Sequence, residues 1–208
     1  MLDSTSSSLP VSLPMRRKAY AVWHSHVNAV RADVSMRDWL TNRDSLTARL
    51  VACSQRFRVE RLKQGRALCL PDEVAAIALP RVQQVIEREV FLRCDEMPVV
   101  YAHTVLPLTA NATHWPLFAS LGNRSLGTTL FNDPLVHRGH LQYARLGRQH
   151  PLMKRIETHS ALPAEYAFLW ARRSVFHRKG SPLLVTEVFL PQILGLAQAK
   201  LADDEKTD

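Results

Sequence analysis

Two pairs of β-rich runs, each pair joined by a short turn, constrain the fold more than any other feature of the sequence. The first pair, within residues 85–107, consists of "VIEREVFLRC" and "VVYAHTVLP", which "DEMP" connects. The second pair lies in "LWARRSVFHRKGSPLLVTEVFLP", residues 169–191, and turns at residues 179–181. Such runs around short turns are typical of antiparallel hairpins. Because helices are expected between the paired strands, the sequence indicates an α+β fold, an antiparallel β-sheet with helices packed on it, rather than an α/β fold.

Helices are predicted where a capping residue precedes a suitable segment. Ser35 would cap a short helix in "SMRDWL", and Asp44 or Ser45 would cap a second one in "DSLTARLVACS". The segment "WPLFASLGNRSLGTTLF" predicts a helix that stops at Gly122, followed by a short helix that Ser125 caps.

Two further strands and two tails complete the expected organisation. Residues 56–65 alternate like a strand that ends at a turn, and another strand is expected around residues 136–146. Residues 1–15 are rich in Ser and Pro and are expected to be disordered. Residues 202–208 form a charged tail, which leaves residues 16–201 as a single predicted domain.

The charge of the chain favours an anionic partner. The 208 residues carry a net charge of +8, which suits nucleic acid, a membrane surface or a small anionic metabolite. The basic residues are scattered, and no nucleic-acid-binding signature is visible. The sequence shows neither an apolar run long enough to span a membrane nor a secretory signal. With three cysteines, Cys53, Cys69 and Cys94, and no CxxC spacing, we expect a cytoplasmic protein with reduced thiols.

The strand "LLVTEVFLP", residues 183–191, carries a carboxylate among apolar residues. Alternation places Glu187 on one face with Leu183, Val185 and Phe189, and both faces of the strand are largely apolar. Burying an ionised carboxylate without a partner costs several kcal/mol. Taken alone, Glu187 is therefore more often a paired structural residue than a catalytic one.

Arg88 is a similar charged residue in the first hairpin. Alternation places it on one face with Val90, Leu92 and Cys94. Within the charged triplet "ERE", residues 87–89, such an arginine is more often a surface residue. Cys94 is more often a packing residue than a reactive one.

These segments resemble the chorismate pyruvate-lyase family, whose members form 4-hydroxybenzoate for ubiquinone synthesis. The matching pieces are "DWL...DSLTARL", "REVFLRCDEMPV", "HTVLP", "LGNRSLGTTLF" and "LWARRSVFHRKGSPLLVTEVFLP", in the order of the family, between residues 38 and 191. The last piece is the most specific. Residues 56–80 match loosely, and residues 147–166 resemble an insertion. The resemblance implies the same antiparallel sheet with packed helices.

The resemblance also implies roles for individual residues. Glu187 would contact the hydroxyl group of the ligand, and Arg88 would hold its carboxylate. Leu126 and Leu46 would close over the ligand; Leu46 stands where the family often has Met, and the two side chains differ little in volume. His103 stands where the family often has an arginine, which puts the role of that position in question.

The chemistry of chorismate suits these residue types. Chorismate is a dianion, and loss of pyruvate together with a ring hydrogen yields an aromatic ring, so no metal, flavin or nucleotide cofactor is expected. Arg88 can bind a carboxylate through two parallel hydrogen bonds. Glu187 can act as general acid toward the departing enolpyruvyl group or can position the ring hydroxyl, and the sequence leaves both roles open. Arg172 or Arg173, which alternate faces, could hold the enolpyruvyl carboxylate.

Three other interpretations are weaker. Metal binding would draw on His24 and His26 or on His137 and His140, but neither pair has a third ligand at a usual spacing. A non-catalytic small-molecule-binding domain of the same fold, as in transcription regulators, has no adequate helix-turn-helix segment before it. Nucleic-acid binding has only the net charge in its favour. The expected partners are therefore chorismate and 4-hydroxybenzoate, with no nucleic acid, no metal and no integral membrane segment.

Overall fold

A computed structural model describes residues 20–110, 112–116, 118–160 and 165–196 of the protein. The strands within these residues are β1 (Phe57–Leu68), β2 (Gln84–Cys94), β3 (Met97–Pro107), β4 (Val136–Arg138), β5 (Gln142–Gly147), β6 (Phe168–Arg178) and β7 (Ser181–Phe189). The labelled helices are a 3₁₀-helix η1 (Val27–Val30) and the α-helices α1 (Val34–Thr41), α2 (Leu46–Ala52), α3 (Leu126–Asn132) and α4 (Pro151–His159), and residues 193–196 are also helical.

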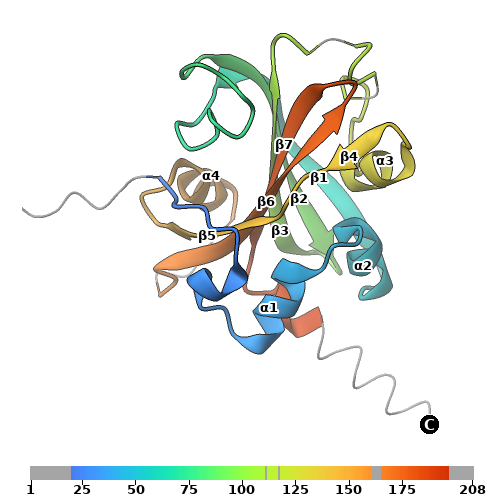
Figure 1. The fold of residues 1–208 in the computed structure, drawn as a ribbon. Coiled ribbons are helices and arrows are strands. Elements are labelled where there is room, and N and C mark those ends of the chain that lie inside the picture. The colour runs from blue at the N-terminus through green and yellow to red at the C-terminus, as the bar shows by residue number, and fades with distance from the viewer. Residues whose placement is uncertain (1–19, 111, 117, 161–164, 197–208) are drawn as a thin grey trace, which may run out of the picture.

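The seven strands form one antiparallel sheet in the order β1-β2-β3-β7-β6-β4 (Figure 1). β4 and β5 pair with different ends of the same edge of β6. The predicted α+β fold with an antiparallel sheet is confirmed.

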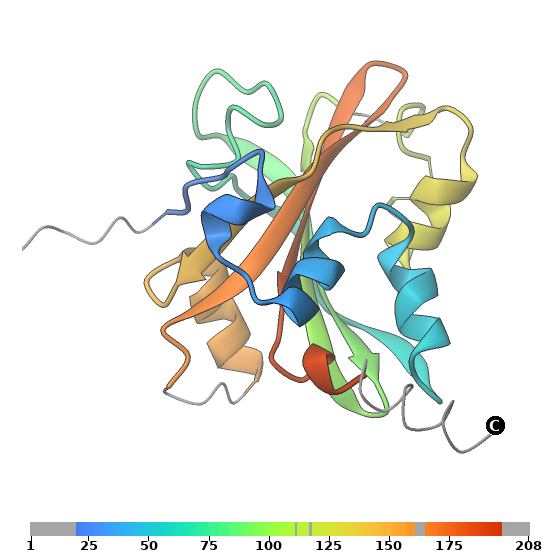
Figure 2. The same cartoon turned by 60° about the horizontal axis from the view of Figure 1, so that its bottom comes forward.

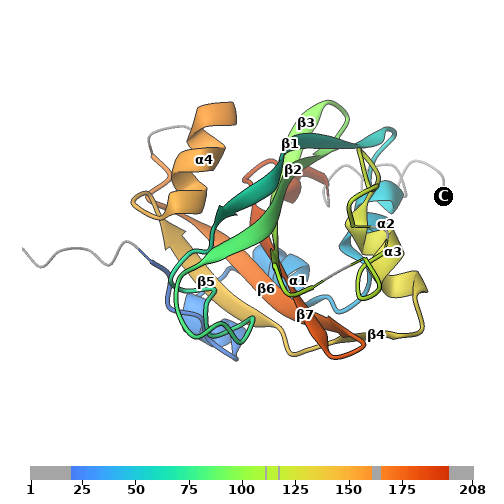
Figure 3. The same ribbon diagram turned by 90° about the horizontal axis from the view of Figure 1, so that it is seen from above.

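Helices and a long loop cover both faces of this sheet, because the central strands are apolar on both sides. α1, α2 and α3 pack on one face, here called the α1–α3 face, over side chains such as Val90 and Phe176. α4 and the segment 69–79 cover the other, the α4 face, over side chains such as Val188 and Leu184. Figure 2 and Figure 3 show α4 and α1–α3 on opposite sides of the strands. Alternation along a strand therefore decides which of two core layers a residue enters.

Both predicted hairpins are present, with tighter turns than expected. Asp95 and Glu96 alone join β2 to β3, and Lys179 and Gly180 alone join β6 to β7. These four residues have positive φ angles of 48°, 69°, 48° and 75°. Two-residue turns of this left-handed kind follow the twist of paired strands. The other residues of "DEMP" and Ser181 therefore belong to strands.

The boundaries of the other predicted strands were wrong. β1 continues through Gly65, which pairs with Glu87 of β2 rather than forming a turn. Pairing with the long strand β2 outweighs the poor strand propensity of a single glycine. The strand expected around residues 136–146 is instead the two short strands β4 and β5.

Capping residues explain where the helices begin. Asp33, not Ser35, is the N-cap of α1, and its carboxylate accepts a hydrogen bond of 2.8 Å from the amide three residues on. Ser45 caps α2, one of the two alternatives predicted. Ser125 precedes α3 as expected, but its hydroxyl bonds to α2 instead of to its own helix.

The helix predicted before Gly122 was wrong. The described residues between 112 and 121 form turns. Trp115, Phe118 and Leu121 are buried in a cluster with α3, so their spacing reflects burial of a loop rather than a helical period.

α4 is an element that the sequence analysis missed, because residues 147–166 were interpreted only as an insertion. Its start carries ordinary helix signals. Pro151 occupies the first turn, and the His150 side chain accepts a hydrogen bond from the Leu152 amide. α4 then buries Leu152, Met153 and Ile156 against the sheet.

Two predictions, disorder of residues 1–15 and a charged tail at 202–208, lie outside the described residues. Within the described part of the chain, no helix is long and apolar enough to cross a membrane.

Candidate active site

A pocket lies on the α1–α3 face of the sheet, beneath α2 and α3. Alternate residues of β2, β3 and β7 form its floor, and β6 and β4 contribute one side. Its volume is about 50 Å³. Its walls are mostly apolar, and its ionisable side chains are those of Arg88, Arg138, Arg172 and Glu187.

The structure brings together most of the site residues selected from the sequence. Five of the six line this pocket, namely Leu46, Arg88, Leu126, Arg172 and Glu187. Arg173 is the exception.

Arg88 enters the pocket from β2 as a buried cation. It shares its face with Val90, as alternation predicted, and is only 2% exposed. Its Nη2 donates to the carbonyl oxygens of Gly122 (3.1 Å) and Arg124 (3.0 Å), while its buried Nε has no partner among the described residues. Burial, and then the positive charge of Arg61, lowers the pKa of Arg88 to about 10. Because no described carboxylate compensates this charge, the pocket is suited to an anion.

Arg172 holds Glu187 in place. The two residues face each other across β6 and β7, and Arg172 Nε donates to the Glu187 carboxylate at 2.5 Å. Arg172 Nη1 donates to the carbonyl oxygens of Trp39, Leu40 and Asn42, at 3.0, 3.3 and 2.6 Å. Arg172 therefore pairs with the carboxylate in the apolar strand and also ties the end of α1 to the sheet.

Arg88 and Glu187 stand at opposite ends of the pocket, separated by β3. Arg88 pairs with Thr104 of β3, and Glu187 pairs with Ala102. Two strand spacings of about 4.8 Å and an offset of two residues, at about 3.4 Å each, place their Cα atoms roughly 12 Å apart. A small ring with polar groups at opposite ends fits this arrangement.

The first turns of two helices cover the pocket. Leu46 and Leu126 are the first residues of α2 and α3, and both line it. The hydroxyl groups of Thr47 and Ser125 form a hydrogen bond of 2.6 Å between the two segments. Gly127 permits this approach, because a Cβ at that position would lie 2.9 Å from Thr47 Oγ1. Covering the pocket removes water, which strengthens charge interactions inside it.

Arg173 lies on the α4 face, because consecutive side chains of β6 point to opposite faces. Its Nε donates to Gln142 Oε1 at 2.8 Å, and its Nη1 donates to the Asp72 carbonyl oxygen at 2.7 Å. Its guanidinium also lies over the Trp23 ring, 4.2 Å from the ring centroid. The structure does not bring Arg173 to the pocket.

Arg138 lines the pocket from β4, and the sequence analysis did not select it. The segment "HRGH" was considered only for its two histidines, and nothing in its local pattern marks the arginine between them. The ligand expected from the sequence is a dianion, and that expectation was the available reason to look for a second cation beside Arg88.

Comparison with known proteins shows the family of the chain. A sequence model described as chorismate lyase matches residues 18–199. The chain belongs to the chorismate lyase family. The resemblance inferred from the sequence motifs is confirmed.

Curated relatives of this chorismate lyase family member carry the name probable chorismate pyruvate-lyase. One from Ralstonia nicotianae is 52% identical over 159 residues, which cover 74% of this chain and 80% of that protein. One from Cupriavidus metallidurans is 45% identical over 179 residues, covering 86% and 84%. One from Nitrosomonas eutropha is 42% identical over 179 residues, covering 86% and 98%.

Solved structures with a similar fold include PhnF from Mycobacterium smegmatis. The TM-score is 0.51 at 12% identity, over 73% of this chain and 66% of that chain. The effector domain of PhnF from the same organism gives a TM-score of 0.50 at 12% identity, over 73% and 91%. At this identity the likeness shows the fold alone.

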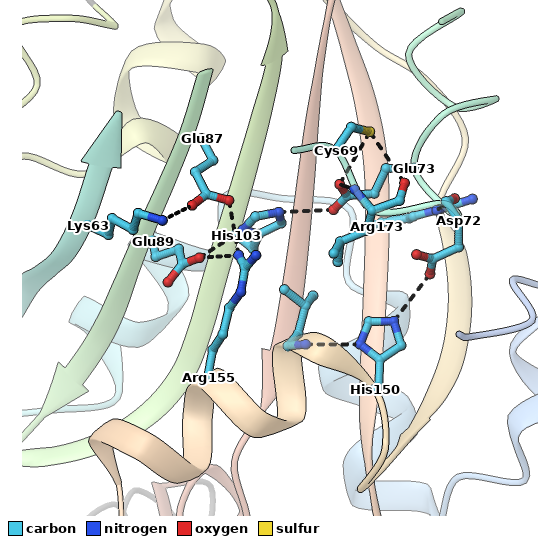
Figure 4. A network of polar contacts seen from close by, with 12 residues as sticks. Lys63, Cys69, Asp72, Glu73, Glu87, Glu89, His103, His150, Arg155 and Arg173 are labelled. Carbon is cyan, nitrogen blue, oxygen red and sulfur yellow. Dashed lines mark hydrogen bonds and ion pairs between the residues drawn. The ribbon is translucent and has the colours of Figure 1, made fainter. Parts of the chain in front are cut away.

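His103 of this chorismate lyase family member lies on the α4 face, outside the pocket (Figure 4). Its Nε2 lies 3.0 Å from Glu73 Oε1, and its Nδ1 lies 3.7 Å from Glu89 Oε1. Burial alone would lower the pKa of His103, but Glu73 and Glu89 outweigh burial and raise it. His103 therefore belongs to a buried network of charges behind the sheet.

Glu87, Glu89 and His103 form the one group of potential metal ligands among the described residues, with ligand atoms within 4.8 Å of one another. None of the four histidines considered from the sequence belongs to it. Lys63 Nζ lies 2.7 Å from a Glu87 oxygen, and Arg155 of α4 pairs with both glutamates. Because two cations already neutralise these carboxylates, the group suits a buried ion network better than a divalent metal.

Proposed function

We propose that the protein is a chorismate pyruvate-lyase, which converts chorismate to 4-hydroxybenzoate and pyruvate as a first step toward ubiquinone. The observation that carries the proposal is Arg88, a buried cation that faces an apolar pocket without a carboxylate partner among the described residues. An anionic ring compound would supply the missing charge. The family of the chain and the names of its relatives support chorismate as that compound.

The proposed reaction breaks one C–O bond and makes the ring aromatic. The ether bond between the ring and the enolpyruvyl group breaks, and its electron pair leaves with the enolpyruvyl oxygen. The ring carbon that bears the hydroxyl loses a proton, and the electrons of that C–H bond complete the aromatic ring. The leaving group takes up a proton and becomes pyruvate. Atoms and charge balance without an oxidant or reductant, and we propose that no cofactor takes part.

Each group of pocket residues meets one requirement of this reaction. Arg88 would hold the ring carboxylate, which lies opposite the ring hydroxyl. Glu187, fixed by Arg172, would contact that hydroxyl, where it can position the group or transfer the proton that the leaving group takes up. Leu46 and Leu126 would cover the ring and exclude water.

Incubation of the purified protein with chorismate tests the proposal. We expect 4-hydroxybenzoate and pyruvate to appear in equal amounts, and we expect Arg88→Met to lose the activity. Binding of chorismate or 4-hydroxybenzoate without turnover would instead make the protein a non-catalytic binding domain of the same fold. The absence of both binding and turnover would remove chorismate as the ligand.

We also propose a cytoplasmic location. Cys53, Cys69 and Cys94 are free, and two of them, Cys69 and Cys94, are buried. Free thiols in a protein core are expected where the compartment keeps them reduced. Fractionation of cells that produce the protein would test this, and recovery with the secreted proteins would contradict it.

A further inference from the structure

We propose that Arg138 binds the enolpyruvyl carboxylate of chorismate, the second of its two negative charges. This inference rests on the proposed function and deepens it. Because 4-hydroxybenzoate lacks that carboxylate, Arg138 would distinguish the substrate from the aromatic product.

Arg138 is held in the pocket wall by contacts that leave its buried Nε–H without an acceptor in the part of the chain that the structure describes. It ends β4 and pairs with Phe176 of β6. Its guanidinium carbon lies 5.5 Å from the ring centroids of both Phe131 and Phe176, and its Nη1 donates to the Arg43 carbonyl oxygen at 2.8 Å. Its Nε is buried and has no partner among the described residues. A buried N–H without an acceptor costs free energy, which a ligand oxygen would recover.

The other arginines near the site have different roles. Arg172 uses its Nε for Glu187 and its Nη1 for three carbonyl oxygens of the protein. Arg173 lies on the α4 face. Arg88 stands beyond β3, at the end of the pocket assigned to the ring carboxylate. Arg138 is thus the lining arginine left for a second carboxylate.

The substitution pattern of chorismate brings the enolpyruvyl group to the end of the pocket where Arg138 lies. The ring hydroxyl lies opposite the ring carboxylate, and the enolpyruvyl ether is on the carbon next to the hydroxyl. With the carboxylate at Arg88 and the hydroxyl at Glu187, the enolpyruvyl group must lie near Glu187. Arg138 and Glu187 both line this pocket, and the negative charge of Glu187 opposes the lowering of the Arg138 pKa that burial causes.

The formal charges of the pocket agree with a dianion. Arg88, Arg138 and Arg172 bring three positive charges and Glu187 brings one negative charge, which leaves a surplus of two positive charges. Chorismate would neutralise this surplus, whereas 4-hydroxybenzoate would neutralise only half of it. A buried charge without a partner is unfavourable, so the pocket should prefer the substrate at Arg138.

The test compares three variants, Arg138→Met, Arg88→Met and Arg145→Met, for chorismate and for 4-hydroxybenzoate. Arg145 is a matched control. Like Arg138 it donates to backbone carbonyl oxygens, those of Val30 and Arg31, and its guanidinium lies 4.5 Å from the centroid of an aromatic ring, that of Phe168. Unlike Arg138, it does not line the pocket.

We expect Arg138→Met to raise KM for chorismate about 10–150-fold, the worth of one hydrogen bond to a charged group. Its Kd for 4-hydroxybenzoate, measured by titration calorimetry, should change less than about threefold. Arg88→Met should weaken the binding of both ligands, and Arg145→Met should weaken the binding of neither. Arg138→Lys keeps the positive charge but loses the planar guanidinium group. It should therefore weaken the binding of chorismate less than Arg138→Met does, and it should leave the binding of 4-hydroxybenzoate unchanged.

Two results would overturn the inference. One is an unchanged KM for chorismate in Arg138→Met, and the other is an equal loss of affinity for chorismate and for 4-hydroxybenzoate. If Arg138→Met does not fold, the same comparison of the two ligands applies to Arg138→Lys. If the wild-type protein does not turn over chorismate, the proposed function fails, but calorimetry with the two ligands still decides whether Arg138 recognises the second carboxylate.

Discussion

Replacing Arg88 with methionine should abolish tight binding of 4-hydroxybenzoate while leaving the ligand-free protein about as stable as the wild type. Methionine keeps an unbranched apolar stem in the same space but carries no charge. The substitution removes the donor to the carbonyl oxygens of Gly122 and Arg124. It also removes a buried positive charge that no described carboxylate neutralises.

These two effects on stability oppose each other. Burial, with Arg61, lowers the pKa of Arg88 from 12.5 to about 10, which corresponds to roughly 3 kcal/mol against the charged form at neutral pH. Leaving a carbonyl oxygen without its donor costs about 1–3 kcal/mol, and two carbonyl oxygens are affected. The net change in the free energy of unfolding should therefore lie between a gain of about 1 kcal/mol and a loss of about 3 kcal/mol.

The effect on binding has no such compensation. In the complex, Arg88→Met leaves the ring carboxylate buried without its cation, which typically costs about 2–5 kcal/mol. The Kd for 4-hydroxybenzoate should rise roughly 30- to 5,000-fold.

Titration calorimetry and thermal unfolding, with and without 4-hydroxybenzoate, measure both quantities. The ligand should raise the melting temperature of the wild type and of Arg145→Met but not that of Arg88→Met, because only a bound ligand stabilises the fold. An unchanged affinity in a folded Arg88→Met protein would remove Arg88 from the site. A large loss of stability without ligand would show that the contacts with Gly122 and Arg124 outweigh the buried charge, and would refute the energetic reasoning.

Three further predictions concern Glu187, His103 and metals. Glu187→Gln keeps an oxygen that can accept from Arg172, so the melting temperature should not change. The value of kcat should fall roughly 10²–10⁴-fold if the carboxyl group transfers a proton, and about tenfold if it only positions the hydroxyl. A large drop in melting temperature with little loss of turnover would make the residue structural. Burial disfavours the charged form of His103, but nearby glutamates outweigh burial and raise its pKa above 6.5. Protonated His103 therefore contributes fully to the free energy of unfolding below pH 6.5, and this contribution is lost as the pH rises through the raised pKa. His103→Asn should remove this slope from unfolding free energies measured between about pH 5 and pH 9, and an unchanged slope would contradict the assignment. EDTA should leave turnover intact because Lys63 and Arg155 neutralise the potential metal ligands; loss of activity that a divalent metal restores would argue against this.

The faces of Arg88 and Glu187 could be predicted from the sequence, because alternation along a strand is a local property. The partner of Glu187 could not be, because it depends on the turn. A three-residue turn at 179–181 would set Glu187 opposite Arg173, whereas the two-residue turn at Lys179 and Gly180 sets it opposite Arg172. A shift of one residue in register thus decides which arginine is the partner of Glu187.

Residues placed by distant contacts were not predictable from local patterns. Arg138 reaches the pocket because β4 pairs with the end of β6, far along the chain. The same is true of the hydrogen bond between Thr47 and Ser125, which joins the segments that cover the pocket. The sequence motifs supplied only Arg88 with a definite role, whereas the proposed dianionic substrate would require two cations, and that requirement points to an arginine such as Arg138.

The triplet "ERE" in β2 shows how the sheet keeps Arg88 without a partner. Its two glutamates are the nearest acids in sequence, yet alternation sends both to the α4 face, where Lys63 and Arg155 pair with them (Figure 4). The backbone of the sheet separates these carboxylates from the pocket, and their charges are already neutralised. α4 therefore contributes indirectly to the site, because Arg155 allows the glutamates to stay buried on their own side. The anion that Arg88 lacks must then come from a ligand, which is the physical reason to expect a carboxylate in the pocket.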